Sequence, residues 1–213
     1  MNVGLASGDA RDVVMENRRR LRAALPGEPY WLRQVHGATV VNAARLNEPA
    51  GADAAFTAEA HVVCVVSVAD CMPVFLADDK ARCVAVAHAG WRGMAAGVIQ
   101  NSVRAMREHL REPDARIVAW LGPAIGPARF EVGVDVLAAM CVMLPLAAEA
   151  FTAIGDGKFV ASLPMLARQA LSQVEVVDVT GGDVCTCSDP VRFYSFRRDR
   201  VTGRHAAVIW MDP

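Results

Sequence analysis

Two apolar runs followed by a helical pattern, between His61 and Asn101, constrain the fold of this chain more than any other feature. The first run, Val62 to Val68, leads into Ala69-Asp70-Cys71-Met72-Pro73, and the second, Arg82 to Ala87, leads into His88-Ala89-Gly90-Trp91-Arg92-Gly93. From Gly93 to Leu110, apolar residues recur at helical spacing. Strand, glycine-rich turn and helix in this order predict an α/β fold with Cys71 and His88 at strand ends, where such folds commonly carry functional residues.

The bulk properties of the chain restrict its class. Its 213 residues suit one domain spanning 1–213, and hydrophobic residues make up 54% of them. A formal net charge of −1 gives no general attraction to nucleic acid or to an anionic membrane, so we expect neither as a partner. The start of the chain lacks the pattern of a signal peptide, which predicts a cytoplasmic protein whose six cysteines are reduced.

Further elements are predicted on both sides of this central unit. Periodicity and turn residues predict helices over 9–25, 93–110 and 163–171, a helical stretch from 134 to about 150 broken near Pro145, and strands over 30–35, 116–121, 174–179 and 205–211. Ser162 is expected to cap the helix that follows it. The strand over 30–35 would end at His36-Gly37, which adds a third metal-binding type of residue at a strand end.

His36, Cys71 and His88 therefore form the candidate site. Two imidazoles and a thiolate suit Zn²⁺, and a site with three protein ligands leaves one position for water or substrate. The same residues allow a metal-free alternative in which Cys71 is the nucleophile and His88 its base, although His36 then has no role. His61, His109 and His205 are interpreted as structural or solvated residues.

Six segments of the chain closely resemble the YfiH-type, or laccase-domain, family. They run in order along the sequence: Gln34 to Gly37, Ala69 to Pro73, His88 to Gly93 (HAGWRG), Leu121 to Pro127, Phe130 to Gly133 and Phe193 to Asp199. The resemblance implies a single α/β domain built as a four-layer α-β-β-α sandwich with mixed sheets, similar to the deamidase domain of cytotoxic necrotizing toxins. It also implies a metal site at His36, Cys71 and His88. The resemblance also leads us to expect a segment before the position of Asn2, with a Thr-Arg-Gly-Gly-type stretch near the site, that this sequence does not include.

The resemblance further implies a zinc-dependent purine nucleoside phosphorylase acting on adenosine, inosine and methylthioadenosine, with adenosine deaminase activity. Its partners would be purine nucleosides and phosphate. The alternatives are a metal-free Cys/His amide hydrolase editing cell-wall precursors, an interaction protein that retains zinc, and the copper polyphenol oxidase of the older family label. Cu²⁺ would also bind such ligands. However, only five histidines exist in the chain, too few for a complete multicopper centre in one subunit.

Individual roles can be assigned as hypotheses. Arginine side chains commonly bind phosphate in proteins. Arg33, close to the candidate ligand His36, and Arg92, at a predicted helix start, are therefore the candidate phosphate-binding residues. Asp70, next to Cys71, would transfer a proton or orient a ligand. Phe193 or Phe196 would stack on a purine base, with a buried core position as the alternative.

Overall fold

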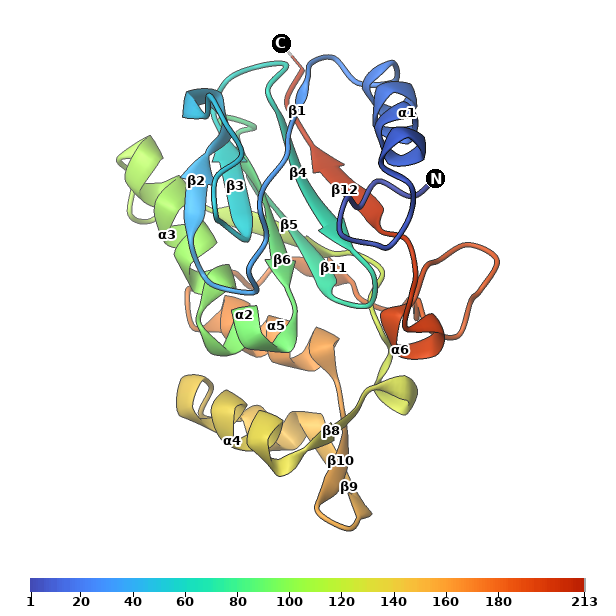
Figure 1. Cartoon of the computed structure of the whole chain (residues 1–213). Coiled ribbons are helices and arrows are strands. Elements are labelled where there is room, and N and C mark those ends of the chain that lie inside the picture. Colours follow the sequence, from blue (N-terminus) through green and yellow to red (C-terminus); the bar gives the residue numbers. More distant parts are fainter. Residues whose placement is uncertain (213) are drawn as a thin grey trace.

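The fold is described from a computed structural model, in which residues 1–212 are placed. Figure 1 shows the helices and strands in the colours of the sequence. The helices are α1 (Arg11–Arg22), α2 (Trp91–Ala95), α3 (Val98–Leu110), α4 (Val134–Met143), α5 (Leu163–Ser172) and α6 (Phe196–Asp199), and short 3₁₀ turns span Ala43–Arg45, Pro127–Arg129 and Ala147–Ala150.

Two mixed sheets form the centre of the molecule. The larger has the order β11 (Val179–Gly181), β7 (Ile117–Leu121), β5 (Met72–Asp78), β6 (Val84–Ala89), β3 (Ala54–Thr57) and β2 (Val40–Asn42). Its two edge strands pair in parallel with their neighbours and the four central strands are antiparallel. The smaller sheet places β4 (Val63–Val68) between β1 (Pro29–Tyr30) and β12 (His205–Ile209).

The two sheets and their helices are stacked in four layers. The apolar core between the sheets includes Val66, Val86 and Ala207, and a larger core lies between the six-stranded sheet and the helices α2, α3 and α5. On the opposite side, α1 covers the outer face of the small sheet (Figure 1). The expected α-β-β-α sandwich with mixed sheets is thus confirmed, because each sheet buries one face against the other and the second face against a helix.

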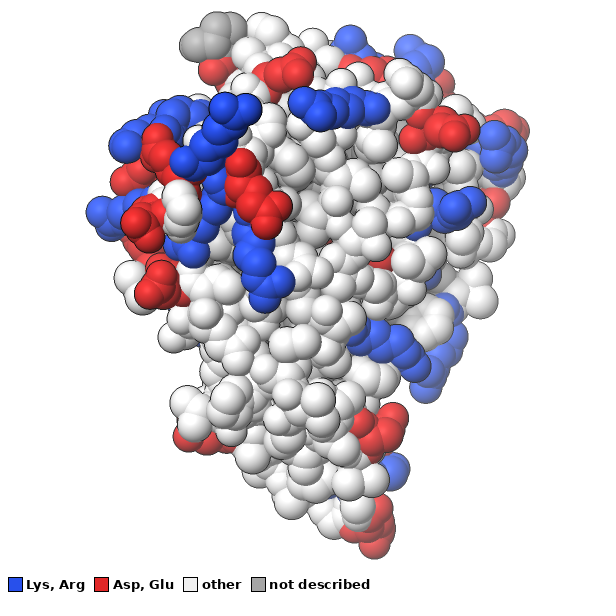
Figure 2. All heavy atoms as spheres, turned by 90° about the vertical axis from the view of Figure 1, so that its left-hand side faces the viewer, with Lys and Arg blue, Asp and Glu red and all other residues white. Residues whose placement is uncertain are grey.

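A smaller unit extends below the sandwich. There α4 packs beside a three-stranded antiparallel sheet of β8 (Glu131–Gly133), β10 (Lys158–Ala161) and β9 (Phe151–Gly155). Figure 2 shows the α3 and α4 side of the molecule, where basic and acidic side chains are mixed over the upper part and the lower part is largely uncharged. Within residues 1–212, no helix has the length and apolar character needed to span a membrane.

Several predicted elements differ from the structure. The strand predicted over 30–35 ends at Tyr30, and the strand predicted over 174–179 begins only at Val179. The helix predicted over 93–110 is two helices, because Gly97 adopts a left-handed conformation (φ 87°) between α2 and α3. The helix over 163–171, its Ser162 cap and the strand over 116–121 were predicted correctly to within one residue, and the break predicted near Pro145 occurs after Met143.

Candidate functional site

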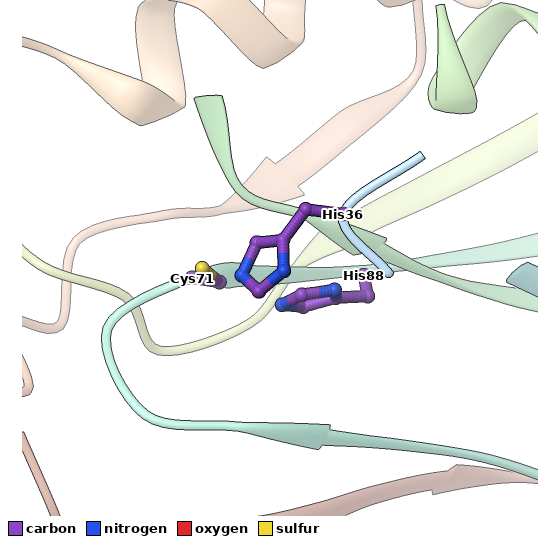
Figure 3. A group of neighbouring side chains, drawn as sticks. All are labelled: His36, Cys71 and His88. Carbon is purple, nitrogen blue, oxygen red and sulfur yellow. The ribbon is translucent and has the colours of Figure 1, made fainter. Parts of the chain in front are cut away.

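His36, Cys71 and His88 come together from three separate segments of the chain. One nitrogen of each histidine and the sulfur of Cys71 all lie within 4.8 Å of one another. Their side chains point toward one another in Figure 3, and the two imidazole rings meet edge to face with their centroids 4.7 Å apart. We call this group the His-Cys-His trio.

The pairing of β5 with β6 explains how Cys71 reaches His88. His88 lies within β6, opposite Pro73 of β5, and Cys71 is the residue just before β5. Gly90, which follows β6, allows the close approach: a Cβ atom at this position would lie 2.6 Å from the Cys71 sulfur. A glycine is therefore required beside the thiol, a constraint that the spacing of the HAGWRG segment does not reveal.

His36 is held differently, in a loop between β1 and β2. It adopts a left-handed conformation with φ 58°, which is uncommon for a residue other than glycine. The carboxylate of Asp53 accepts hydrogen bonds from the backbone N–H groups of Val35 (3.1 Å), His36 (2.9 Å) and Gly37 (2.7 Å). These bonds replace the strand that the sequence predicted at this position.

Asp53 also contacts the other histidine of the trio. Its Oδ1 lies 2.8 Å from Nδ1 of His88, and its side chain is fully buried. The pairing of β3 with β6 places Ala54 opposite Ala87, so Asp53 and His88 are neighbours at the end of these strands. Because Nδ1 of His88 contacts the Asp53 carboxylate, Nε2 is the nitrogen that faces the other two members of the trio, His36 and Cys71.

Asp53 is not among the candidate residues predicted from the sequence. Its signal is weak, since Asp53 closes a turn-rich stretch and looks like an ordinary loop residue. The one indication in the sequence is that a carboxylate directly precedes the apolar run Ala54-Ala55-Phe56, which the structure shows to belong to a fully buried strand. A charged group at the entrance to such a strand needs a buried partner.

The trio and Asp53 change the pKa values of one another. Burial opposes ionisation of the Cys71 thiol, but hydrogen bonds from His36 and His88 outweigh it and lower the pKa of Cys71 to about 6. Burial likewise opposes protonation of His88, yet the contacts with Asp53 and Cys71 raise the pKa of its imidazole to about 9. In the metal-free protein at neutral pH, the site therefore favours a thiolate beside an imidazolium.

Asp70 has a structural position in this site. Its Oδ1 accepts a hydrogen bond from the Thr186 hydroxyl (2.6 Å), and its Oδ2 accepts bonds from the Ser195 hydroxyl (2.9 Å) and the Arg197 backbone N–H (2.6 Å). Both oxygens are thus engaged, and the side chain is buried. Proton transfer by Asp70 stays a prediction. The carboxylate attaches the 186–197 segment to the turn that carries Cys71.

A cleft of about 270 Å³ is lined in part by His36 and Cys71 of the trio, but not by His88. Its apolar lining includes Ile125, Phe130, Leu163 and Phe196, and its charged lining includes Arg92, Arg197 and Arg200. Of the residues nominated from sequence, Arg33 and Phe193 lie elsewhere. The Arg33 side chain is exposed and lies beside Gly51, and the ring of Phe193 packs on His205. A second cavity of about 340 Å³ lies beyond Ile125 but contains none of the trio.

The residues of the trio fit a zinc ion. Nitrogen and sulfur donors are the ligands that Zn²⁺ takes, three of them converge, and the Asp53 contact orients one imidazole as ligating histidines are commonly oriented. Among residues 1–212 this is the only cluster of three such side chains. His109 and His205 pack instead on Phe56 and Tyr194, and His61 lies in a turn.

The chain resembles known proteins over its whole length. A family model described as "Multi-copper polyphenol oxidoreductase laccase" matches residues 1–212. The purine nucleoside phosphorylase YfiH of Escherichia coli is 44% identical over 216 residues, covering 99% of this chain and 86% of that protein. A purine nucleoside phosphorylase of Pseudomonas aeruginosa is 43% identical over 215 residues with the same coverage.

A solved structure shows the same fold. A Neisseria meningitidis protein of the DUF152 family superposes with a TM-score of 0.93 at 44% identity, covering 100% of this chain and 86% of that one. Because a family model and close relatives both match nearly every residue, the chain belongs to the YfiH-type laccase-domain family.

Proposed function

We propose that this protein is a zinc-dependent purine nucleoside phosphorylase. The observation that carries the proposal is the cleft, which is lined by His36 and Cys71 of the His-Cys-His trio together with apolar and arginine side chains. Relatives that cover nearly all of this chain bear the name purine nucleoside phosphorylase. Adenosine, inosine and methylthioadenosine are the proposed substrates, with deamination of adenosine as a second activity.

His36, Cys71 and His88 would hold the zinc ion. A zinc ion with three protein ligands supplies a Lewis acid and a water molecule activated near neutral pH. Asp53 fixes the backbone that carries His36 and orients the ring of His88. This arrangement leaves the donor atoms preorganised, so little reorganisation accompanies metal binding.

The rest of the cleft would bind the two substrates. A purine is flat and largely apolar, and Phe196, which is 47% exposed, offers a ring on which it can stack. Arg92 is the proposed contact to phosphate, since it lines the cleft and lies over the Trp91 ring. In phosphorolysis, a phosphate oxygen forms a bond to the sugar C1′, the bond from C1′ to the purine nitrogen breaks, and the departing base takes up a proton.

A metal-free hydrolase is the second candidate. The observation in its favour is the Cys71-His88-Asp53 arrangement, in which a thiol of lowered pKa contacts an imidazole that is oriented by a carboxylate. A cell-wall amide is the proposed substrate class. In this case, His36 would be a second hydrogen-bond donor to the thiolate.

A multicopper oxidase has less support. Such an enzyme needs several clusters of imidazole ligands. Two of the five histidines belong to the trio, and the described residues 1–212 contain no further group of three metal-binding side chains. A copper ion would therefore occupy the same trio as zinc.

The first experiment measures metal content and turnover together. Protein purified without added metal should carry about one zinc ion per chain, the ratio expected of a single site. It should release free base from adenosine and inosine only when phosphate is present. Cys71→Ala should lose both zinc and base release, whereas Cys141→Ala, which changes an exposed thiol outside the site, should retain both.

The two candidates give opposite results on removal of the metal. Loss of base release on chelation, restored by added zinc, supports the phosphorylase. Base release that persists in metal-free protein or in Cys71→Ala would contradict the zinc site. Amide hydrolysis that survives chelation and is abolished by alkylation of Cys71 would favour the hydrolase.

A further inference from the structure

Arg200 has a backbone conformation that arginine rarely adopts. Its φ is 62° and its ψ is −65°, and the N–H of Val201 donates a hydrogen bond to the carbonyl of Asp199 (2.7 Å). These values define a γ-turn of the positive-φ form, which is rare and strained for any residue with a Cβ atom. Glycine would adopt this conformation with less strain, so the side chain of Arg200 has to be explained.

The surrounding segment holds this turn in place. The N–H groups of Asp199 and Arg200 donate to the carbonyls of Ser195 and Phe196, at 3.0 Å each. The guanidinium of Arg198 contacts both carboxylate oxygens of Asp199, and it also donates to the carbonyls of Thr186, Cys187 and Phe193. Through Ser195 and Asp70, the same segment is attached to the turn that carries Cys71.

The arginines that line the cleft differ in the contacts of their guanidinium groups. The guanidinium of Arg197 donates to the carbonyls of Arg129 and Glu131. By contrast, Arg92 and Arg200 form no ion pair with any carboxylate of residues 1–212, although both line the cleft. Asp70 is the one carboxylate among the lining residues, and its oxygens are engaged with Thr186, Ser195 and the Arg197 backbone.

The cleft thus contains two guanidinium groups, those of Arg92 and Arg200, that are not paired with a carboxylate of residues 1–212. A guanidinium binds a phosphate or carboxylate with two parallel hydrogen bonds, and two such groups at one cleft favour an anion that carries two charges. The inorganic phosphate used in phosphorolysis is an anion of this kind. The strain at Arg200 fits such a role, since strained residues are concentrated at ligand-binding sites.

We propose that Arg200 binds the phosphate co-substrate at the cleft, on the side of α6, while Arg92 binds it from the side of α2. The proposal rests on the phosphorylase function and adds to it the residue that determines affinity for phosphate. Arg200 should therefore influence phosphate binding and leave binding of the nucleoside largely unchanged.

The test compares Arg200→Gly with a matched control. Glycine is compatible with the γ-turn and removes the whole side chain, including the guanidinium. Arg111→Gly makes the same chemical change at another exposed arginine of positive φ (56°), outside the residues that line the cleft. In Arg200→Gly, the KM for phosphate should rise roughly 10- to 100-fold, as expected when a charge-assisted contact is lost, with the KM for inosine nearly constant. Arg111→Gly should match the wild-type protein, and Arg200→Lys should lie between the two.

Calorimetric titration with inorganic phosphate, without nucleoside, provides a readout that does not depend on turnover. Weaker phosphate binding by Arg200→Gly than by Arg111→Gly supports the inference. Equal KM for phosphate and equal binding in the two variants would overturn it while leaving the phosphorylase intact. If the wild-type protein releases no base, the proposed function fails, and the titration alone decides whether Arg200 binds the anion. No phosphate binding by the wild-type protein would also refute the inference.

Discussion

Asp53 shows at the scale of a single residue how one side chain can organise a site. Its two oxygens accept hydrogen bonds from three backbone N–H groups of the loop that carries His36, and one of them also contacts the ring of His88. Burial opposes ionisation of this carboxyl, but the contact with His88 and the backbone hydrogen bonds keep its pKa below the usual value. The carboxylate is therefore charged at neutral pH and serves both histidines of the trio.

We predict that Asp53→Asn weakens metal binding. An amide has one acceptor oxygen and one NH₂ group, so at least one of the four N–H donors would face another donor. Zinc affinity, measured by competition with a chromogenic chelator, should fall by about 10- to 100-fold. Asp114→Asn, a change at an exposed carboxylate, is the control. Unchanged zinc affinity in Asp53→Asn would show that Asp53 does not orient the ligands.

At the scale of the element, the predicted helix cap at Ser162 was confirmed, whereas apolar periodicity predicted one helix where the structure has two. Ser162 lies before an apolar helical pattern, and in the structure its hydroxyl accepts a hydrogen bond from the N–H of Met165 at 3.3 Å. The pattern over 93–110 is also regular, because Met94 and Val98 are both buried on one side, yet Gly97 interrupts the helix. Periodicity reports which face is buried and does not detect a local change in backbone conformation.

The Ser162 cap provides a stability test for α5. Ser162→Ala removes the acceptor for the Met165 N–H and should lower the free energy of unfolding by about 1 kcal/mol, as measured by urea denaturation. Ser162→Thr retains a hydroxyl and should lose less. Equal destabilisation by the two substitutions would indicate that packing at this position, and not the cap, determines the effect.

At the scale of the whole molecule, ion pairs connect the end of the central sheet to α3. Arg82 contacts the buried Asp78 at the end of β5 (2.8 Å) and also Glu112, just after α3 (2.7 Å). Hydrogen bonds from Arg82 outweigh the effect of burial and lower the pKa of Asp78. Because the pKa of Asp78 is lower in the folded state than its usual value of 3.8, ionised Asp78 stabilises the fold at pH values above 3.8. This contribution is lost as the pH falls through the pKa of the folded state.

This network predicts a pH-dependent stability difference. Arg82→Gln leaves a buried carboxylate without its partner and should lower the free energy of unfolding at pH 7 by about 2 to 3 kcal/mol. The difference from the wild-type protein should shrink as pH is lowered below 4, because Asp78 becomes protonated in both proteins. Thermal unfolding at a series of pH values measures it, with Arg104→Gln, at an exposed arginine on α3, as the control. A difference that stays constant down to pH 2.5 would contradict this explanation.

The sequence implied the four layers of the fold through its resemblance to a known family, and it singled out the three side chains of the trio. Apolar patterning identified β4, β7, β12 and the covering helices, because burial of a face follows directly from the order of apolar and polar residues. It did not predict β3 and β5 of the large sheet, or β10 and the mostly exposed β9, and it placed His36 at the end of a strand that in the structure ends at Tyr30.

The tertiary structure alone decided how these residues meet. Cys71 approaches His88 through the register of β5 and β6, and Asp53 reaches both histidines across 17 and 35 residues of sequence. It also decided which arginines line the cleft: Arg33, nominated from its neighbour His36, lies outside, and Arg200 lies within. Hydrogen bonds and strand register act between segments distant in the chain, so local patterns contain no record of them.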